Sequence, residues 1–328
     1  MPPTDESRRT SSMGVGTTQS ARRARRRIAD VGDERLRRAR RQWAAVLIVA
    51  VLFFAAVYLL AVQTTLGQRV EDTALLGADQ VDPELHRVAL RAFHTITLSS
   101  QIVATVLVAL IGLLRRQVWL AVAGVGVILG GQAVTQVVKF HVLSRPDLTA
   151  VDGQFAENTL PSGHTTAAMC LLFATMIVMP YRYRGVAMFL TLTWAVGIGA
   201  YTVIIQAHRL SDTLAADAVA LATACVAALL LSRTGRIRAV VTPSPQRYVL
   251  RTVFVVGVGI VGVACLGLGG VQMLHAVAAH VEDEPTSWRL FLSSQWLAAA
   301  GSIASALLFW WTWYRLETKR RHDPIETR

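Results

Sequence analysis

The chain has 328 residues, of which 53% are hydrophobic and only 16% are charged. This composition is far more apolar than that of an average soluble domain and excludes an ordinary globular protein. The net charge of +12 raises the alternative of a nucleic-acid-binding protein, because clustered arginines neutralise phosphates. The arginines instead recur at alternate connections between apolar runs, a pattern of membrane topology, and we expect no nucleic-acid partner.

Residues 1–42 are polar at first and then arginine-rich, without a sustained apolar face. This pattern predicts a disordered basic cytoplasmic tail. The first apolar run is too long and too far from the N-terminus for a signal peptide, so we expect it to remain in the protein as a membrane span.

Eight apolar runs follow, each near the length of about 20 residues with which a helix crosses a bilayer. They lie at about 43–63, 94–114, 118–138, 164–180, 186–206, 211–231, 252–274 and 292–314. The sequence therefore predicts an all-α fold, a polytopic membrane helical bundle. We divide it into a six-transmembrane core at 43–231, a cytoplasmic linker at 232–251, two additional transmembrane helices at 252–314 and a cytoplasmic tail at 315–328.

Basic and acidic residues alternate between successive connections. Because basic loops stay in the cytoplasm, both termini are predicted to be cytoplasmic, and residues 64–93, 139–163 and 275–291 are predicted to lie outside. We expect an integral protein of a bacterial plasma membrane. The first outer loop carries acids, including Glu71 and Asp72, and ends in a partly amphipathic run that predicts an interfacial helix.

The tetrapeptide Pro161, Ser162, Gly163 and His164 directly precedes an apolar run and predicts a helix start. Backbone N–H groups are unpaired at such a start, Gly163 lets an anion approach, and the Ser162 hydroxyl adds a donor, so the turn suits phosphate. The alternative is that Ser162 only caps the helix and that His164 has no chemical role.

Two cations, Lys139 and Arg145, precede this turn on a loop predicted to lie outside, where basic residues are normally few. An arginine fork and a lysine point charge together suit a phosphate group. The alternative is that Lys139 snorkels to the membrane surface and that Arg145 forms a surface pair with Asp147.

His208 and Asp212 are four residues apart, which places them on one face of a predicted helix. A carboxylate bonded to one imidazole nitrogen fixes the tautomer and leaves the other nitrogen free to attack, as a nucleophilic histidine requires. The alternative is a salt bridge between Arg209 and Asp212, with His208 as a bystander.

In this order the three patterns resemble the type 2 phosphatidic acid phosphatase superfamily, which shares a helical bundle with vanadium haloperoxidases. Its motifs are Lys with a spacer and Arg-Pro, then Pro-Ser-Gly-His, then Ser-Arg with a spacer, His, three residues and Asp. The resemblance covers 139–216 directly and 43–231 more loosely. The spacer between Lys139 and Arg145 is one residue short, and Thr202 stands where the third motif has arginine. Arg209 and His141 are candidates to compensate.

The resemblance implies that His208 attacks phosphorus to give a phosphohistidine, and that Asp212 orients it. His164 would protonate the leaving oxygen and later activate water. No metal or other cofactor is implied. The residues expected to bind phosphate are Lys139, Arg145, Ser162 and Gly163.

The predicted function is hydrolysis of a lipid phosphomonoester or diphosphate at the outer face, and the expected partners are this substrate and membrane lipids. Two alternatives stay open. One is a phosphotransferase between lipid carriers, and the other is a catalytically silent family member acting as a scaffold or lipid transporter. The sequence names neither the lipid nor the oligomeric state.

Overall fold

The computed structural model describes residues 6–95, 98–149, 157–239, 245–279 and 284–318. Ten α-helices, three short helical turns and one pair of strands make up this part of the chain. The elements are α1 (Glu6–Val57), η1 (Tyr58–Val62), α2 (Thr65–Gly77), η2 (Ala78–Gln80), α3 (Pro83–Thr95), α4 (Leu98–Leu114), α5 (Val118–Val137), η3 (Val138–Val142), α6 (Gly163–Val178), α7 (Arg184–Ile204), α8 (Leu210–Arg233), β1 (Ile237–Ala239), α9 (Pro245–Ala279), α10 (Glu284–Thr312) and β2 (Leu316–Thr318).

The predicted all-α bundle is confirmed, but the number of eight spans is not. Among the described residues six helices are long and apolar enough to cross a membrane, and a seventh span results if α3 and α4, which meet at 60°, are counted as one. Helix α6 is apolar but has only 16 residues. At 1.5 Å per residue it is about 24 Å long, which is less than the hydrocarbon core of about 30 Å. The protein is thus an integral membrane protein with about six helical spans.

Helix α1 differs from the disordered tail predicted for residues 1–42, because it begins at Glu6 and continues into the first span without a break. Its later part packs on the bundle: Ala39 is buried, and Arg40 donates hydrogen bonds to the side chain and carbonyl of Ser232. Once one end of a helix is anchored in this way, each further residue adds a hydrogen bond at low cost, and alanine and arginine favour the extension.

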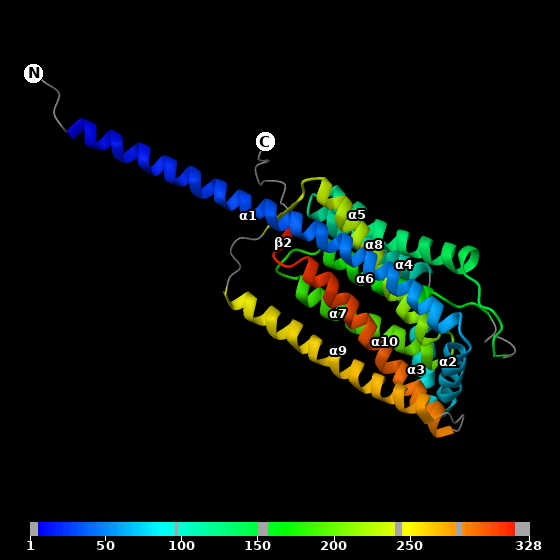
Figure 1. Ribbon diagram of the computed structural model, residues 1–328. Helices are drawn as coiled ribbons and strands as arrows, with labels where there is room; N and C mark the ends of the chain where they lie inside the picture. Colours follow the sequence, from blue (N-terminus) through cyan, green and yellow to red (C-terminus); the bar gives the residue numbers. More distant parts are fainter. Residues whose placement is uncertain (1–5, 96–97, 150–156, 240–244, 280–283, 319–328) are drawn as a thin grey trace, which may run out of the picture.

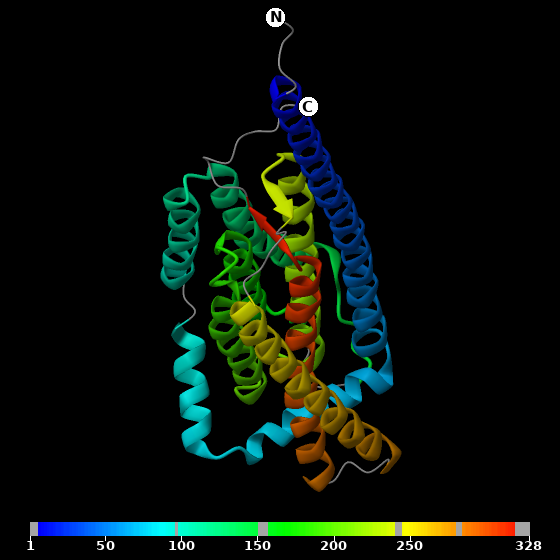
Figure 2. The same ribbon diagram turned by 90° about the vertical axis from the view of Figure 1, so that its left-hand side faces the viewer.

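The connections gather at the two ends of the bundle (Figures 1 and 2). One end holds α2, the start of α3 and the end of η3. The other end holds the short strands β1 and β2, which pair antiparallel, and the turn between α4 and α5. The helix predicted at the end of the first outer loop is present as α3. The sequence motifs that resemble a phosphatase all lie at the end that contains α2.

Helix α6 lies inside the bundle, where it packs against α4, α5, α7, α8 and α10. Nearly every residue of α6 after His164 is buried, in agreement with an apolar sequence that has no polar face. Phe173 of α6 meets Phe309 of α10 edge to face, with ring centroids 5.0 Å apart. This burial fixes the helix whose first turn carries the second motif.

Helix α10 belongs to the same packed core, although the sequence predicts it as one of two added helices. The Ser302 hydroxyl donates to the buried carboxylate of Asp217 on α8, with oxygen–oxygen distances of 3.0 and 3.1 Å. The Trp43 indole of α1 donates to Thr312 at 2.9 Å. Helix α9, in contrast, packs mainly on α10 and covers its outer side (Figure 1).

Candidate active site

The second motif forms the start of α6. Ser162 has extended backbone angles, and its hydroxyl accepts a hydrogen bond from the backbone N–H of Thr165 at 3.3 Å, so it caps the helix as the alternative interpretation predicts. Gly163 is the first residue of the helix, and a Cβ added to it would come no closer than 4.0 Å to Gln136 Nε2, its nearest neighbour from another element. A group the size of a methyl therefore fits beside Gly163 without a clash.

The third motif forms the start of α8, and here the expected geometry is wrong in one respect. His208 precedes the helix, which begins at Leu210, so His208 and Asp212 do not share a helical face. Asp212 instead reaches back as in a helix cap: its Oδ2 accepts the backbone N–H of Arg209 at 3.0 Å and lies 3.1 Å from His208 Nδ1. Both side chains are buried, so the pair is held in a single arrangement.

The second and third motifs are joined directly. The backbone N–H of Ser162 donates to the carbonyl of Asp212 at 3.0 Å, and the hydroxyl of Thr159 donates to the Asp212 carboxylate at 2.5 Å. The two histidine rings, His164 and His208, have centroids 6.4 Å apart. His164 and His208 thus lie close together although they come from different elements, and the carboxylate of Asp212 is bonded to His208.

Two arginines donate hydrogen bonds to the same carboxylate in this region. Asp72 Oδ1, on α2, accepts from Arg145 Nη2 at 3.2 Å and from Arg209 Nε and Nη2 at 3.2 and 3.0 Å. Both guanidinium groups are buried. The sequence raised Asp147 and Asp212 as alternative partners for the two arginines, but both arginines instead form ion pairs with Asp72.

Burial lowers the pKa of Arg145, and the positive charge of Arg209 adds to this effect, while Asp72 and Glu71 act against it. The neighbouring acid Glu71 binds the start of α8, because its Oε1 accepts the backbone N–H of Ser211 at 2.8 Å. Burial raises the pKa of Glu71 to about 7, and the nearby carboxylate of Asp212 contributes in the same direction. Two adjacent acids of α2 therefore support both arginines and α8.

Sequence reasoning did not select Glu71, Asp72 or Thr159 as site residues. Their signal in the sequence is weak, because the two acids resemble ordinary residues of an outer loop, and Thr159 matches no motif. A tertiary contact between α2 and the loop after η3 brings the acids to the site: Gln68 Nε2, one turn before Asp72, donates to the carbonyl of Pro146 at 2.7 Å.

Lys139 and His141 lie on the turn η3 at the end of α5. The Lys139 carbonyl accepts from Asn158 at 3.2 Å, which connects η3 to the chain just before the second motif, while its ammonium lies 5.7 Å from the ring centroid of Phe140. His141 is exposed. In the part of the chain that the structure describes, no hydrogen bond or ion pair links either side chain to the two arginines.

Thr202, which occupies the place of the third-motif arginine, is completely buried near the end of α7. Its hydroxyl donates to the carbonyl of Gly199 at 2.8 Å, so its side chain is engaged within its own helix. The guanidinium that reaches the site from this part of the chain belongs to Arg209, which directly precedes α8.

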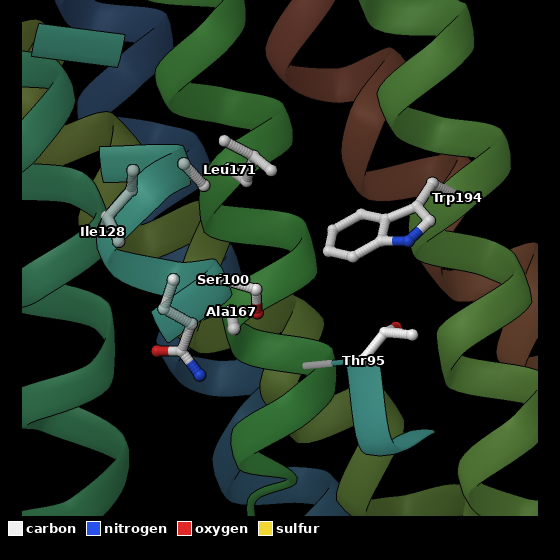
Figure 3. Close-up of a pocket in the computed structure, with 8 residues that line it drawn as sticks. Thr95, Ser100, Ile128, Ala167, Leu171 and Trp194 are labelled. Carbon is white, nitrogen blue, oxygen red and sulfur yellow. The ribbon is translucent and has the colours of Figure 1, made fainter. Parts of the chain in front are cut away.

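An apolar cavity of about 270 Å³ lies beside α6, between α3–α4, α5 and α7 (Figure 3). Ala167 and Leu171 follow His164 by three and seven residues, so all three lie on one face of α6. The Trp194 ring projects from α7 towards α6 in the close-up. At the end of α6 nearest the site, Phe93 stacks on His164 with ring centroids 3.9 Å apart.

No curated protein and no solved structure matches the chain. One family model does match, over a segment that contains all three motifs, the α5–α8 helices and most of β1. Residues 118–238 match the PAP2 superfamily, and the chain is therefore a multi-span helical membrane protein that carries a PAP2 superfamily domain.

Proposed function

We propose that the chain is a membrane phosphatase that hydrolyses a lipid phosphate through a phosphohistidine on His208. The observation that carries the proposal is the buried pair of His208 Nδ1 and Asp212 Oδ2 at 3.1 Å, with the ring of His164 6.4 Å away. The PAP2 superfamily domain supports a phosphatase activity of this kind.

In the proposed reaction Nε2 of His208 attacks phosphorus, and the bond between phosphorus and the lipid oxygen breaks. Because Nδ1 is held by Asp212, Nε2 is the nitrogen left for attack, and the carboxylate stabilises the positive charge that develops on the ring. His164 gives its proton to the departing lipid oxygen. It then takes a proton from a water molecule, which attacks phosphorus and releases inorganic phosphate and free His208.

The non-bridging phosphate oxygens would be bound by Arg145, by Arg209 and by the first N–H groups of α6, with Lys139 nearby on η3. Arg209 takes the place of the arginine absent at Thr202, since its guanidinium shares Asp72 with that of Arg145. Donors fixed before the reaction stabilise charge in the transition state without reorganisation. Ser162 contributes mainly by capping α6.

A lipid is the substrate class that fits best, because the apolar cavity is lined by Ala167 and Leu171 of α6 (Figure 3), and by helical spacing these two residues share a face with His164. The leaving oxygen of a lipid phosphate is attached to its apolar tail. His164, at the end of α6 nearest the site, would protonate that oxygen while the tail lies against Ala167 and Leu171.

The test is phosphate release by purified protein from a panel of lipid monophosphates and diphosphates, compared with a short water-soluble phosphate ester. We expect release from at least one lipid phosphate and much slower release from the soluble ester. Transfer of phosphate to an added lipid alcohol, without free phosphate, would replace hydrolysis by the transferase alternative. Binding without turnover would leave the silent alternative.

A further inference from the structure

The carboxylate of Asp72 contacts both arginines of the site. Its Oδ1 accepts from Arg145 at 3.2 Å and from two nitrogens of Arg209 at 3.2 and 3.0 Å. Asp72 lies on α2, outside the segment that matches the PAP2 superfamily. A residue from a preceding segment thus reaches the phosphate-binding side chains of the matched domain.

Several contacts fix the position of this carboxylate. The hydroxyl of Thr149 donates to Asp72 Oδ2 at 3.0 Å, so the second oxygen is held as well as the first. Helix α2 is capped by Thr64, which accepts from Gly67 at 3.0 Å. At its other end Gly77 packs against α10 so closely that an added Cβ would lie 2.2 Å from the Ser287 carbonyl oxygen. Helix α2 therefore cannot shift without disturbing α10.

A fixed carboxylate between two guanidinium groups has a clear physical effect. Two buried positive charges repel each other, and the shared negative charge offsets this repulsion. The position of Arg209 in the fold also differs from that of the motif arginine. Arg209 directly precedes α8, whereas the motif position, Thr202, lies in α7. Three hydrogen bonds to Asp72 help to orient both guanidinium planes, together with Glu71 beside Arg145 and Thr159 beside Arg209, which leaves less freedom for the arginines when an anion arrives.

We propose that Asp72 is a positioning residue that holds Arg145 and Arg209 together as a single anion-binding unit, and so makes up for the arginine missing at Thr202. The inference rests on the proposed function in one respect, namely that the anion is the phosphate of a substrate. Asp72 itself is negatively charged and does not bind the phosphate. Its effect passes through the two arginines.

The opposite role is also chemically conceivable, because a carboxylate can occupy the place of a phosphate and block it. The two roles predict opposite results for anion affinity. If Asp72 positions the arginines, removing its charge weakens anion binding. If Asp72 blocks the site, removing its charge frees both arginines and tightens anion binding.

The experiment measures orthovanadate binding to the full-length detergent-solubilised protein by calorimetry, together with the kinetics of lipid phosphate hydrolysis. For Asp72→Asn we expect vanadate affinity and kcat/KM each to fall on the order of 10-fold or more, as expected for arginines that are charged but misplaced. Asp72→Glu keeps the charge and should recover part of the loss. The control is Glu84→Gln, which removes an exposed acid paired with Arg87 on α3 and should leave both quantities unchanged.

A double-mutant comparison separates positioning from a general effect on folding. In a chain that already carries Arg145→Ala and Arg209→Ala, Asp72→Asn should cause no further loss of vanadate affinity, because no arginine remains to be positioned. A loss as large as in the wild-type background would overturn the proposal. So would tighter vanadate binding by Asp72→Asn, or unchanged affinity in folded protein. If Asp72→Asn does not fold, Asp72→Glu and the double-mutant comparison built on it decide the question.

The same measurements distinguish a failure of the proposed function from a failure of the inference about Asp72. If the wild-type protein binds vanadate but releases phosphate from no lipid phosphate, hydrolysis is wrong, and the vanadate affinities of the variants still decide whether Asp72 positions the arginines. If hydrolysis occurs and Asp72→Asn behaves as wild type in both measurements, only the inference about Asp72 is wrong.

Discussion

The backbone N–H of His208 donates to the carbonyl of Thr202 at 3.1 Å, so the residue that replaces the family's arginine still supports the candidate nucleophile through its main chain. The Thr202 side chain is buried and bonded to Gly199. Arg209 places a guanidinium beside that of Arg145 on Asp72, and we propose that it compensates for the arginine that the family motif has at this position.

Arg209→Ala tests this compensation. Loss of one charge-bearing donor to a developing anion typically slows an enzyme about 100- to 1,000-fold, so we expect a fall of at least about 100-fold in kcat/KM. Arg209→Lys should recover only part of the rate, because lysine lacks the planar fork. Arg87→Ala, which breaks an exposed pair with Glu84, is the matched control and should be close to wild type. A wild-type rate for Arg209→Ala would contradict the assignment.

Replacing His208 and replacing His164 by alanine should affect turnover and the phosphorylated intermediate differently. His208→Ala removes the atom that bonds to phosphorus, so turnover should stop, and no acid-labile phosphate label should be trapped on the protein. His164→Ala should still bind substrate but form the labelled intermediate more slowly, because only the leaving group is affected. Rapid-quench trapping with phosphorus-labelled substrate measures both. Equal trapping on His208→Ala and wild type would remove His208 from the mechanism.

The cavity beside α6 can be narrowed from the α4 side. Ala104 lines it from α4, and Ala104→Phe adds an aromatic ring to a volume of about 270 Å³. We expect kcat/KM to fall on the order of 10-fold for a long-chain lipid phosphate and to change little for a short soluble ester, because only the long tail needs the cavity. Leu110→Phe, at an exposed position of the same helix, is the control. An equal loss on both substrates would mean that the ring disturbs the catalytic residues and not a tail site.

Glu71 should make stability depend on pH. Its pKa is raised from 4.5 to about 7 in the folded protein, mainly by burial. The folded chain thus binds a proton that the unfolded chain releases, and this stabilising contribution is present below about pH 4.5 and is lost as the pH rises through about 7. Glu71→Gln stays neutral, so its Tm should fall less than that of the wild type from about pH 5 to about pH 7. Parallel Tm curves for the two proteins would show that Glu71 does not titrate in this range.

Membrane orientation can be tested with single cysteines at the two ends of the bundle. Glu84, at the end that carries the site, and Arg236, at the other end, are both exposed, whereas the three native cysteines are buried. We expect a membrane-impermeant maleimide to label Glu84→Cys in intact cells and Arg236→Cys only after permeabilisation, since basic connections stay inside. The reverse pattern would show that the site faces the cytoplasm.

The sequence alone determined the helical class, the approximate positions of the helices and the three motifs that converge at one end of the bundle. Apolar run length and charge alternation suffice for this, because the bilayer requires continuous helices whose backbone groups are paired within the helix. Sequence and structure differ where a property depends on neighbouring helices. The sequence predicts a span for α6, which has only 16 residues and is not confirmed as one, and a disordered tail where the structure has α1 from Glu6.

Only the tertiary structure decided which ion pairs form at the site. Arg145 and Arg209 are 64 residues apart, and Asp72 precedes both by more than 70, so no local spacing rule connects them. Their meeting depends on how α2 packs against α10 and against the loop after η3. Burial then determines which ion pairs form. A guanidinium removed from water must find an acceptor, and the fold places the carboxylate of Asp72 between the two arginines.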